Sequence, residues 1–126
     1  MSYWSEHIHI VQMRFSEHVS MAEFELWLSQ MERFFLKKQP FAVVMQTEVY
    51  TDFPENYRQV QASWYKKNKS YFYQYCLGLA RIAQNEADLI RLNTPALHAA
   101  WRVPYFVTID QQEALQWAVQ RWICKI

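Results

Sequence analysis

The sequence has 126 residues, of which 52% are hydrophobic and 17% aromatic, with 13 Lys and Arg against 12 Asp and Glu. This composition predicts a single folded domain over residues 1–126 and excludes a largely disordered chain. A formal net charge of +1 gives no field that would favour nucleic acid or acidic membranes, and one glycine, Gly78, excludes most phosphate-binding loops.

The sequence contains no feature typical of membrane insertion or export. Its apolar runs are far shorter than the roughly 18–20 residues of a membrane helix, and residues 1–7 lack the pattern of a signal peptide. Cys76 and Cys124 are too few to indicate a disulfide scaffold. We therefore expect a cytoplasmic protein without membrane insertion.

The first half of the chain predicts strand, helix and strand. Residues 7–15 alternate, with Val11, Met13 and Phe15 on the buried side. Ser20 can form a capping box, and the apolar spacing behind it predicts a helix of about 17 residues. Residues 41–47 are a continuous apolar run, which is typical of a central strand buried on both faces.

The middle of the chain predicts a loop, a long helix and a third strand. Residues 52–55 are predicted as an exposed loop, because breakers follow directly on the apolar run. The apolar spacing after this loop predicts a helix of about 20 residues with Trp64 and Tyr71 on its inward stripe. Residues 77–83 predict a strand in which Gly78 allows a neighbour to approach closely.

The last third predicts helix, strand and helix. Asn85 can cap a helix that Thr94 and Pro95 either kink or restart. Residues 104–109 predict a fourth strand, and Asp110 opens a final helix with a second capping box. Strands separated by helices need crossover connections, so we predict a small α/β fold with a mostly parallel sheet of about four strands and helices on its faces.

Several motifs of the second half occur together in one known family. They are Trp64 with Asn68, Tyr-Cys-Leu-Gly-Leu-Ala at 75–80, Arg91 with Leu97 and Trp101, Val-Pro-Tyr-Phe-Val at 103–107, and Glu-Ala-Leu-Gln-Trp at 113–117. In these motifs the chain resembles a bacterial subgroup of the STAS-like (anti-anti-sigma-factor antagonist-like) domain family. The resemblance implies βα units around a small sheet and a role in protein–protein regulation.

The chain departs from this family at the turn after the central strand. Phosphorylation-switched members have Asp-Ser-x-Gly there, whereas this sequence reads Tyr-Thr-Asp-Phe-Pro at 50–54. Thr51 is the nearest hydroxyl, and the switch serine is missing. We predict that Thr51, Asp52, Phe53 and Glu55 form an interaction loop.

The residues give no indication of an enzyme. His7 and His9 could face a common metal, but no Cys or carboxylate has ligand spacing to them, and a solvated strand edge explains them equally well. Cys76 leads into an apolar strand and is interpreted as a buried, inert thiol. Since no catalytic signature is recognisable, we expect a non-enzymatic protein without catalytic residues, metal or cofactor.

A basic aromatic segment raises the question of nucleic acid. Residues 65–73 interleave rings with lysines, the composition of a single-strand platform. On a helix, however, Lys66, Lys67 and Lys69 would face water, so we interpret them as a solvated face and expect no nucleic-acid partner.

The sequence has more aromatic residues than the predicted buried faces of its helices and strands contain. Eight rings lie outside these faces: Tyr3, Trp4, Tyr50, Phe53, Tyr65, Tyr73, Trp101 and Trp117. They could be scattered surface rings, but Trp and Tyr are enriched at interfaces, and we predict a homodimer with Trp101 and Trp117 in one patch.

Two classes of function stay open at this point. The first is a non-enzymatic interaction or regulatory module of STAS-like type with an unknown protein partner. The second is a small-ligand-binding domain with an aromatic-lined pocket at the carboxyl edge of the sheet.

Overall fold

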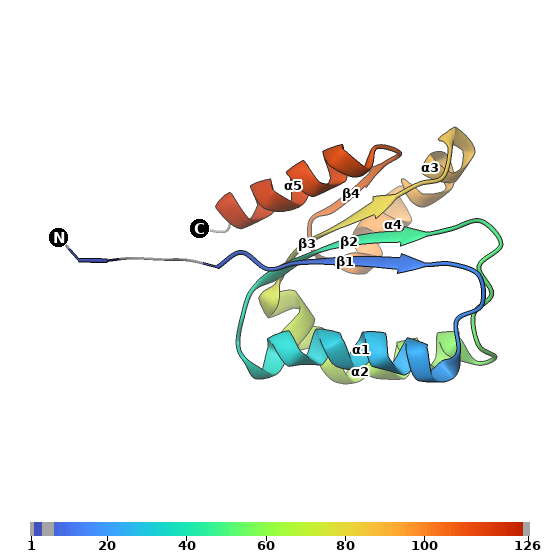
Figure 1. Ribbon diagram of the computed structural model, residues 1–126, viewed down its shortest axis with the longest axis horizontal. Coiled ribbons are helices and arrows are strands. Elements are labelled where there is room, and N and C mark those ends of the chain that lie inside the picture. The colour runs from blue at the N-terminus through green and yellow to red at the C-terminus, as the bar shows by residue number, and fades with distance from the viewer. Residues whose placement is uncertain (1, 4–6, 125–126) are drawn as a thin grey trace.

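The computed structural model describes residues 2–3 and 7–124 and shows a parallel sheet between two layers of helices (Figure 1). Strands and helices alternate along the chain, with two short helices before the last strand. The elements are β1 Ile10–Phe15, α1 Met21–Leu36, β2 Phe41–Thr47, α2 Tyr57–Tyr75, β3 Cys76–Ile82, α3 Glu86–Leu92, α4 Pro95–Trp101, β4 Tyr105–Thr108 and α5 Gln111–Ile123.

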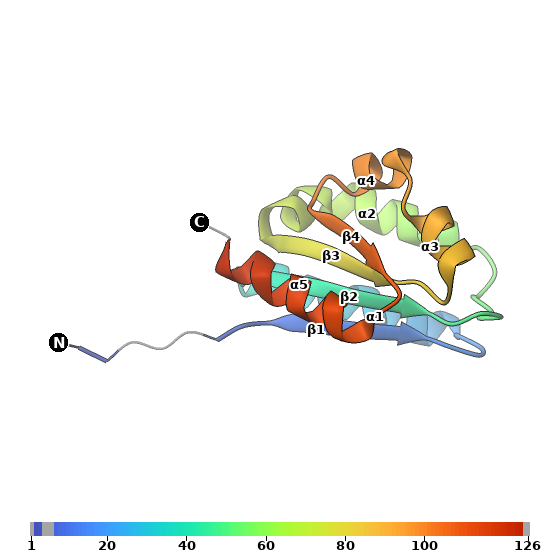
Figure 2. The same cartoon turned by 90° about the horizontal axis from the view of Figure 1, so that it is seen from above.

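The four strands lie in sequential order, β1-β2-β3-β4, and every neighbouring pair is parallel. When parallel strands follow one another in order across a sheet and all their crossover connections have the same hand, the connecting helices lie on the same face of the sheet. Helices α1 to α4 accordingly cover one face, and α5, which follows the last strand, covers the other (Figures 1 and 2). The predicted small parallel α/β fold is confirmed.

The main core lies between the sheet and α1 to α3. Phe41, Val43 and Met45 point from β2 into this layer, where they meet Phe35 of α1 and Phe72 of α2. Alternation along β2 sends its other residues to the α5 face. The predicted central strand, buried on both sides, is therefore confirmed.

The second core, under α5, is built from small side chains. Ala42 of β2 and Ala80 of β3 face Ala114 and Ala118 of α5, and all four side chains are fully buried. Small residues on both surfaces let the helix lie close to the sheet.

Helix starts follow the predicted caps. Ser20 Oγ accepts the Glu23 N–H at 3.1 Å, and the Glu23 carboxylate accepts the Ser20 N–H at 3.0 Å, which completes the capping box. Asn85 Oδ1 accepts from the N–H of Asp88 at 2.9 Å. Thr94 caps α4 with Pro95 at its first position, so the chain restarts a helix there rather than kinking one.

Three details differ from the sequence prediction. The first strand begins at Ile10 rather than at residue 7. Tyr71, assigned to the inward stripe of the long helix, is 50% exposed, because α2 turns Asn68 and Phe72 toward the sheet instead. Asp110 caps α5 by accepting from the N–H groups of Gln112 and Glu113, but its own N–H donates to Thr108 Oγ1, so the predicted second capping box is only half formed. None of the described helices is long and apolar enough to cross a membrane.

Candidate functional site

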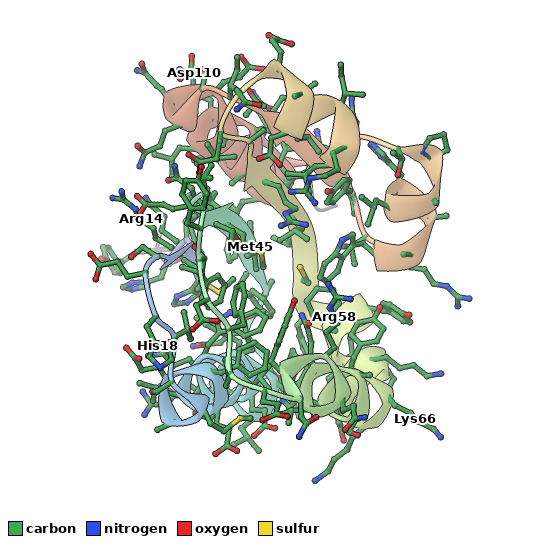
Figure 3. All side chains as sticks on the ribbon, turned by 90° about the vertical axis from the view of Figure 1, so that its right-hand side faces the viewer. Arg14, His18, Met45, Arg58, Lys66 and Asp110 are labelled. Carbon is green, nitrogen blue, oxygen red and sulfur yellow. The ribbon has the colours of Figure 1, made fainter. Side chains whose placement is uncertain are left out.

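A cavity of about 670 Å³, here called the outer chamber, lies at the carboxyl edge of the sheet, where β1, β2 and β3 end. Figure 3 looks onto this edge, with Met45 near the centre of the view. The start of α1, the loop after β2 and α3 complete its lining. Parallel α/β sheets bind ligands at this edge, because the loops there are free to carry specific side chains.

One side of the outer chamber is a fixed polar network. Gln84 Nε2 donates to the Thr47 carbonyl at 2.9 Å, which ties the ends of β2 and β3 together. Asp88 accepts from the Gln84 N–H at 2.9 Å and from Arg91 Nη2 at 2.5 Å. Partial burial alone would raise the pKa of Asp88, but these hydrogen bonds and the charges of Arg91 and Arg81 lower it. The carboxylate is therefore ionised at neutral pH.

Arg81 places a cation on the inner face of the sheet. The strand register sets it between Met45 of β2 and Val107 of β4, both apolar and buried. It is half-buried, lines the outer chamber and forms no ion pair within the described part of the chain. Its charge still acts on Asp88 and on Tyr105, whose pKa is raised chiefly by burial.

The opposite side of the outer chamber is an aromatic wall made of Phe15, Phe24, Trp27, Phe53 and Tyr57. Phe15 and Trp27 meet edge to face with ring centroids 5.2 Å apart. Phe53 and Tyr57 stack at 4.7 Å. Such packed rings hold their positions with few rotatable bonds, so the wall is preformed.

A second cavity of about 330 Å³, the inner chamber, lies behind the first, between the sheet and helices α1, α2 and α4. Four residues line both chambers: Trp27, Met45, Gln61 and Trp101. Apolar side chains dominate the rest of its lining, including Met13, Leu28, Met31, Val43, Phe72, Leu79 and Leu97. The two chambers therefore adjoin along these four residues, one with a polar side at the edge of the sheet and the other with mostly apolar walls.

The predicted loop at 52–55 follows β2 and belongs to neither a strand nor a helix, as expected. Asp52 and Glu55 are exposed, and Asp52 Oδ2 lies 2.9 Å from His18 Nδ1. Thr51 Oγ1 donates to the Glu48 carbonyl at 2.6 Å. Thr51 and Phe53 line the outer chamber, whereas Glu55 does not. The four residues thus separate into two pocket residues and two surface residues.

Trp101 and Trp117 lie on opposite faces of the sheet and cannot share one patch. Trp101 ends α4 and packs on the main core, 6.1 Å from Phe72 between ring centroids. Trp117 belongs to α5 and stacks on Phe106 at 5.4 Å. The single patch predicted from their sequence positions is wrong, because α4 belongs to the crossover between β3 and β4, whereas α5 follows the last strand and packs on the opposite face.

Most rings of the aromatic surplus are built into the structure. Tyr3 and Tyr50 are 88% and 96% exposed, while Trp4 lies outside the described residues. The other five are half-buried: Phe53, Tyr65, Tyr73, Trp101 and Trp117. Of these, Phe53, Tyr65 and Trp101 line one or both chambers. The surplus therefore serves the cavity walls more than an outer surface.

The cysteines and histidines stand apart from the chambers. Burial raises the pKa of the Cys76 thiol to about 12, so it stays protonated, and Cys124 is exposed. His9 lies against the rings of Phe34 and Trp122. Within residues 2–3 and 7–124, no three side chains of His, Cys, Asp or Glu gather closely enough to hold a metal ion.

Sequence reasoning missed the polar side of the site, namely Arg81, Gln84, Asp88 and Arg91. A signal for Arg81 is present in the sequence, because a cation interrupts an otherwise apolar strand.

The chain matches no protein-family model, and no curated protein or solved structure is significantly similar to it. The STAS-like resemblance therefore stays a prediction.

Proposed function

We propose that the protein is a small-molecule-binding domain whose site is the adjoining outer and inner chambers. The observation that carries this proposal is the pairing of a polar mouth, at the ligand-binding edge of a parallel sheet, with an apolar space behind it. Volumes of about 670 and 330 Å³ fall within the range of ligand pockets.

The side chains that line the outer chamber are suited to binding a ligand without converting it. The described lining of the outer chamber includes no serine, cysteine, histidine or lysine. Its two carboxylates already serve cations, since Asp88 binds Arg91 and Glu48 pairs with Arg14. The threonine hydroxyls that line it, Thr47 and Thr51, have no histidine or lysine beside them among these lining residues to act as a base, while groups that orient a ligand are abundant.

A regulatory role through a protein partner is the second class predicted from the sequence. It stays a prediction here, as does the homodimer, and the separation of Trp101 from Trp117 removes the patch on which the dimer was centred. A ligand-binding domain can itself regulate a partner, so the two classes are compatible.

Native mass spectrometry of freshly purified protein tests the proposal. We expect a fraction with an added mass that disappears on denaturation, or, for emptied protein, binding of members of a mixed library of acids, amines and neutral compounds. Bare protein that binds no member of such a library would overturn the proposal. A Trp101→Asp variant, which places a charge between the chambers, should lose the binding.

A further inference from the structure

The cation at the mouth of the chambers is unusual in its setting. Arg81 stands in a row of the sheet with Met13, Met45 and Val107 as its register partners across three strands. Beside these apolar side chains the Tyr105 hydroxyl is a neutral hydrogen-bond partner of the half-buried guanidinium, and the loss of hydration stays costly unless an anion replaces the water. The sheet itself offers no such anion in this row.

The nearby acid does not balance the cations. Asp88 is the carboxylate that acts on Arg81, yet its Oδ1 already accepts from Nε and Nη2 of Arg91 at 3.2 and 2.5 Å. Glu48, the other carboxylate of the outer chamber, pairs with Arg14. Arg81 is therefore left without a carboxylate of its own, and with Arg14 counted beside Glu48 the described charges here are three arginines against two carboxylates.

The walls of the inner chamber do not suit a charged group. Among the described residues that line this chamber, Arg58 is the one with a charge, and this side chain is exposed and hydrogen-bonded to the Tyr57 hydroxyl at 3.1 Å. In Figure 3 Arg58 lies on α2, on the opposite side of the opening from Arg14. The remaining walls are chiefly Met, Leu, Val, Phe and Trp. An apolar group gains from leaving water there, whereas a charged group would lose its hydration.

Resting on the proposed function, we infer that the ligand is an apolar monocarboxylate, whose carboxylate meets Arg81 while its hydrocarbon body lies in the inner chamber. The body passes Met45, Trp27 and Trp101, which border both chambers. Arginine suits this task, because its planar guanidinium stays charged and can donate two parallel hydrogen bonds to a carboxylate. Acids with aliphatic and with aromatic bodies share this chemistry.

Titration calorimetry with three ten-carbon probes tests the inference: decanoate, decanol and decylamine, each below its micelle concentration. We expect wild-type protein to bind decanoate most tightly and decylamine most weakly. Arg81→Gln should weaken decanoate binding roughly tenfold and leave decanol unchanged, since the variant removes a charge-assisted hydrogen bond. Arg33→Gln, an exposed charge change on α1, is the matched control and should change neither. Replacing decanoate with 2-naphthoate then distinguishes aliphatic from aromatic bodies.

The outcomes separate the two proposals. Equal or tighter binding of decanol or decylamine by the wild type would overturn the carboxylate inference and leave the ligand-binding proposal standing. Absence of binding by all three probes would also overturn the inference, while the mixed library decides the proposed function independently. The comparison of head groups uses wild-type protein, so it holds even if Arg81→Gln fails to fold.

Discussion

The indole ring of Trp117 lies directly against Gly78: a Cβ atom placed on Gly78 would be 2.8 Å from Trp117 Cη2 and 3.0 Å from Arg121 Cγ. The one glycine of the sequence thus marks a place where side chains of α5 lie against the backbone of β3. Its predicted role, to admit a close neighbour, is confirmed. The rigid ring, more than the flexible arginine, sets the space available.

Gly78→Ala is therefore expected to destabilise the protein by about 1–3 kcal/mol, the usual cost of overpacking a core. Urea denaturation measures the change. In a Trp117→Leu background the same substitution should cost clearly less, because the smaller side chain yields space. An equal cost in both backgrounds would mean that the ring is not the obstacle.

Trp64→Ala tests the packing between α1 and α2. Trp64 Nε1 donates to Glu32 Oε1 at 2.8 Å, and its ring stacks on Phe35 with centroids 6.0 Å apart. The ring is half-buried, so we expect a loss of about 3 kcal/mol, the low end for removal of a large core ring. Trp64→Phe keeps the ring contact and should cost less; an unchanged denaturant midpoint for Trp64→Ala would contradict this packing.

Asp88 should make the stability depend on pH in the acid range. Its pKa is lowered in the folded protein, so its contribution is complete above the ordinary carboxyl pKa of 3.8 and is lost as the pH falls through the folded value. Denaturation measured between pH 6 and about pH 2 should show Asp88→Asn to be less stable at neutral pH, with the difference shrinking in acid. A difference that grows toward low pH would refute this role.

Tyr50 carries backbone strain beside the outer chamber. Its φ is +67°, a region that favours glycine, and its side chain is 96% exposed. We expect Tyr50→Gly to raise the free energy of unfolding by roughly 1 kcal/mol, because glycine accepts this conformation without a Cβ clash. Tyr50→Ala retains the Cβ and should bring no such gain. Equal stability of the two variants in thermal melts would contradict the strain.

Much of the fold could be predicted from the sequence, because local signals and tertiary structure agree. The Ser20 capping box and the apolar run at 41–47 set their element boundaries through backbone hydrogen bonding and burial, which are properties of neighbouring residues. The facing of Trp101 depends instead on how α4 sits over a distant helix, and no local pattern encodes that. The polar mouth escaped prediction although Gln84, Asp88 and Arg91 are close in sequence, because the face on which Arg81 lies is set by the register of β3 with β2 and β4.

The central claim is that the adjoining chambers bind a ligand, and the indole N–H signals of the tryptophans test it in place. In a ¹H–¹⁵N spectrum assigned by single Trp→Phe variants, added decanoate should shift Trp27 and Trp101, which line both chambers. Trp117, on the opposite face of the sheet, serves as the internal control and should not move. Shifts confined to Trp117, or saturating binding that moves neither Trp27 nor Trp101, would contradict the account.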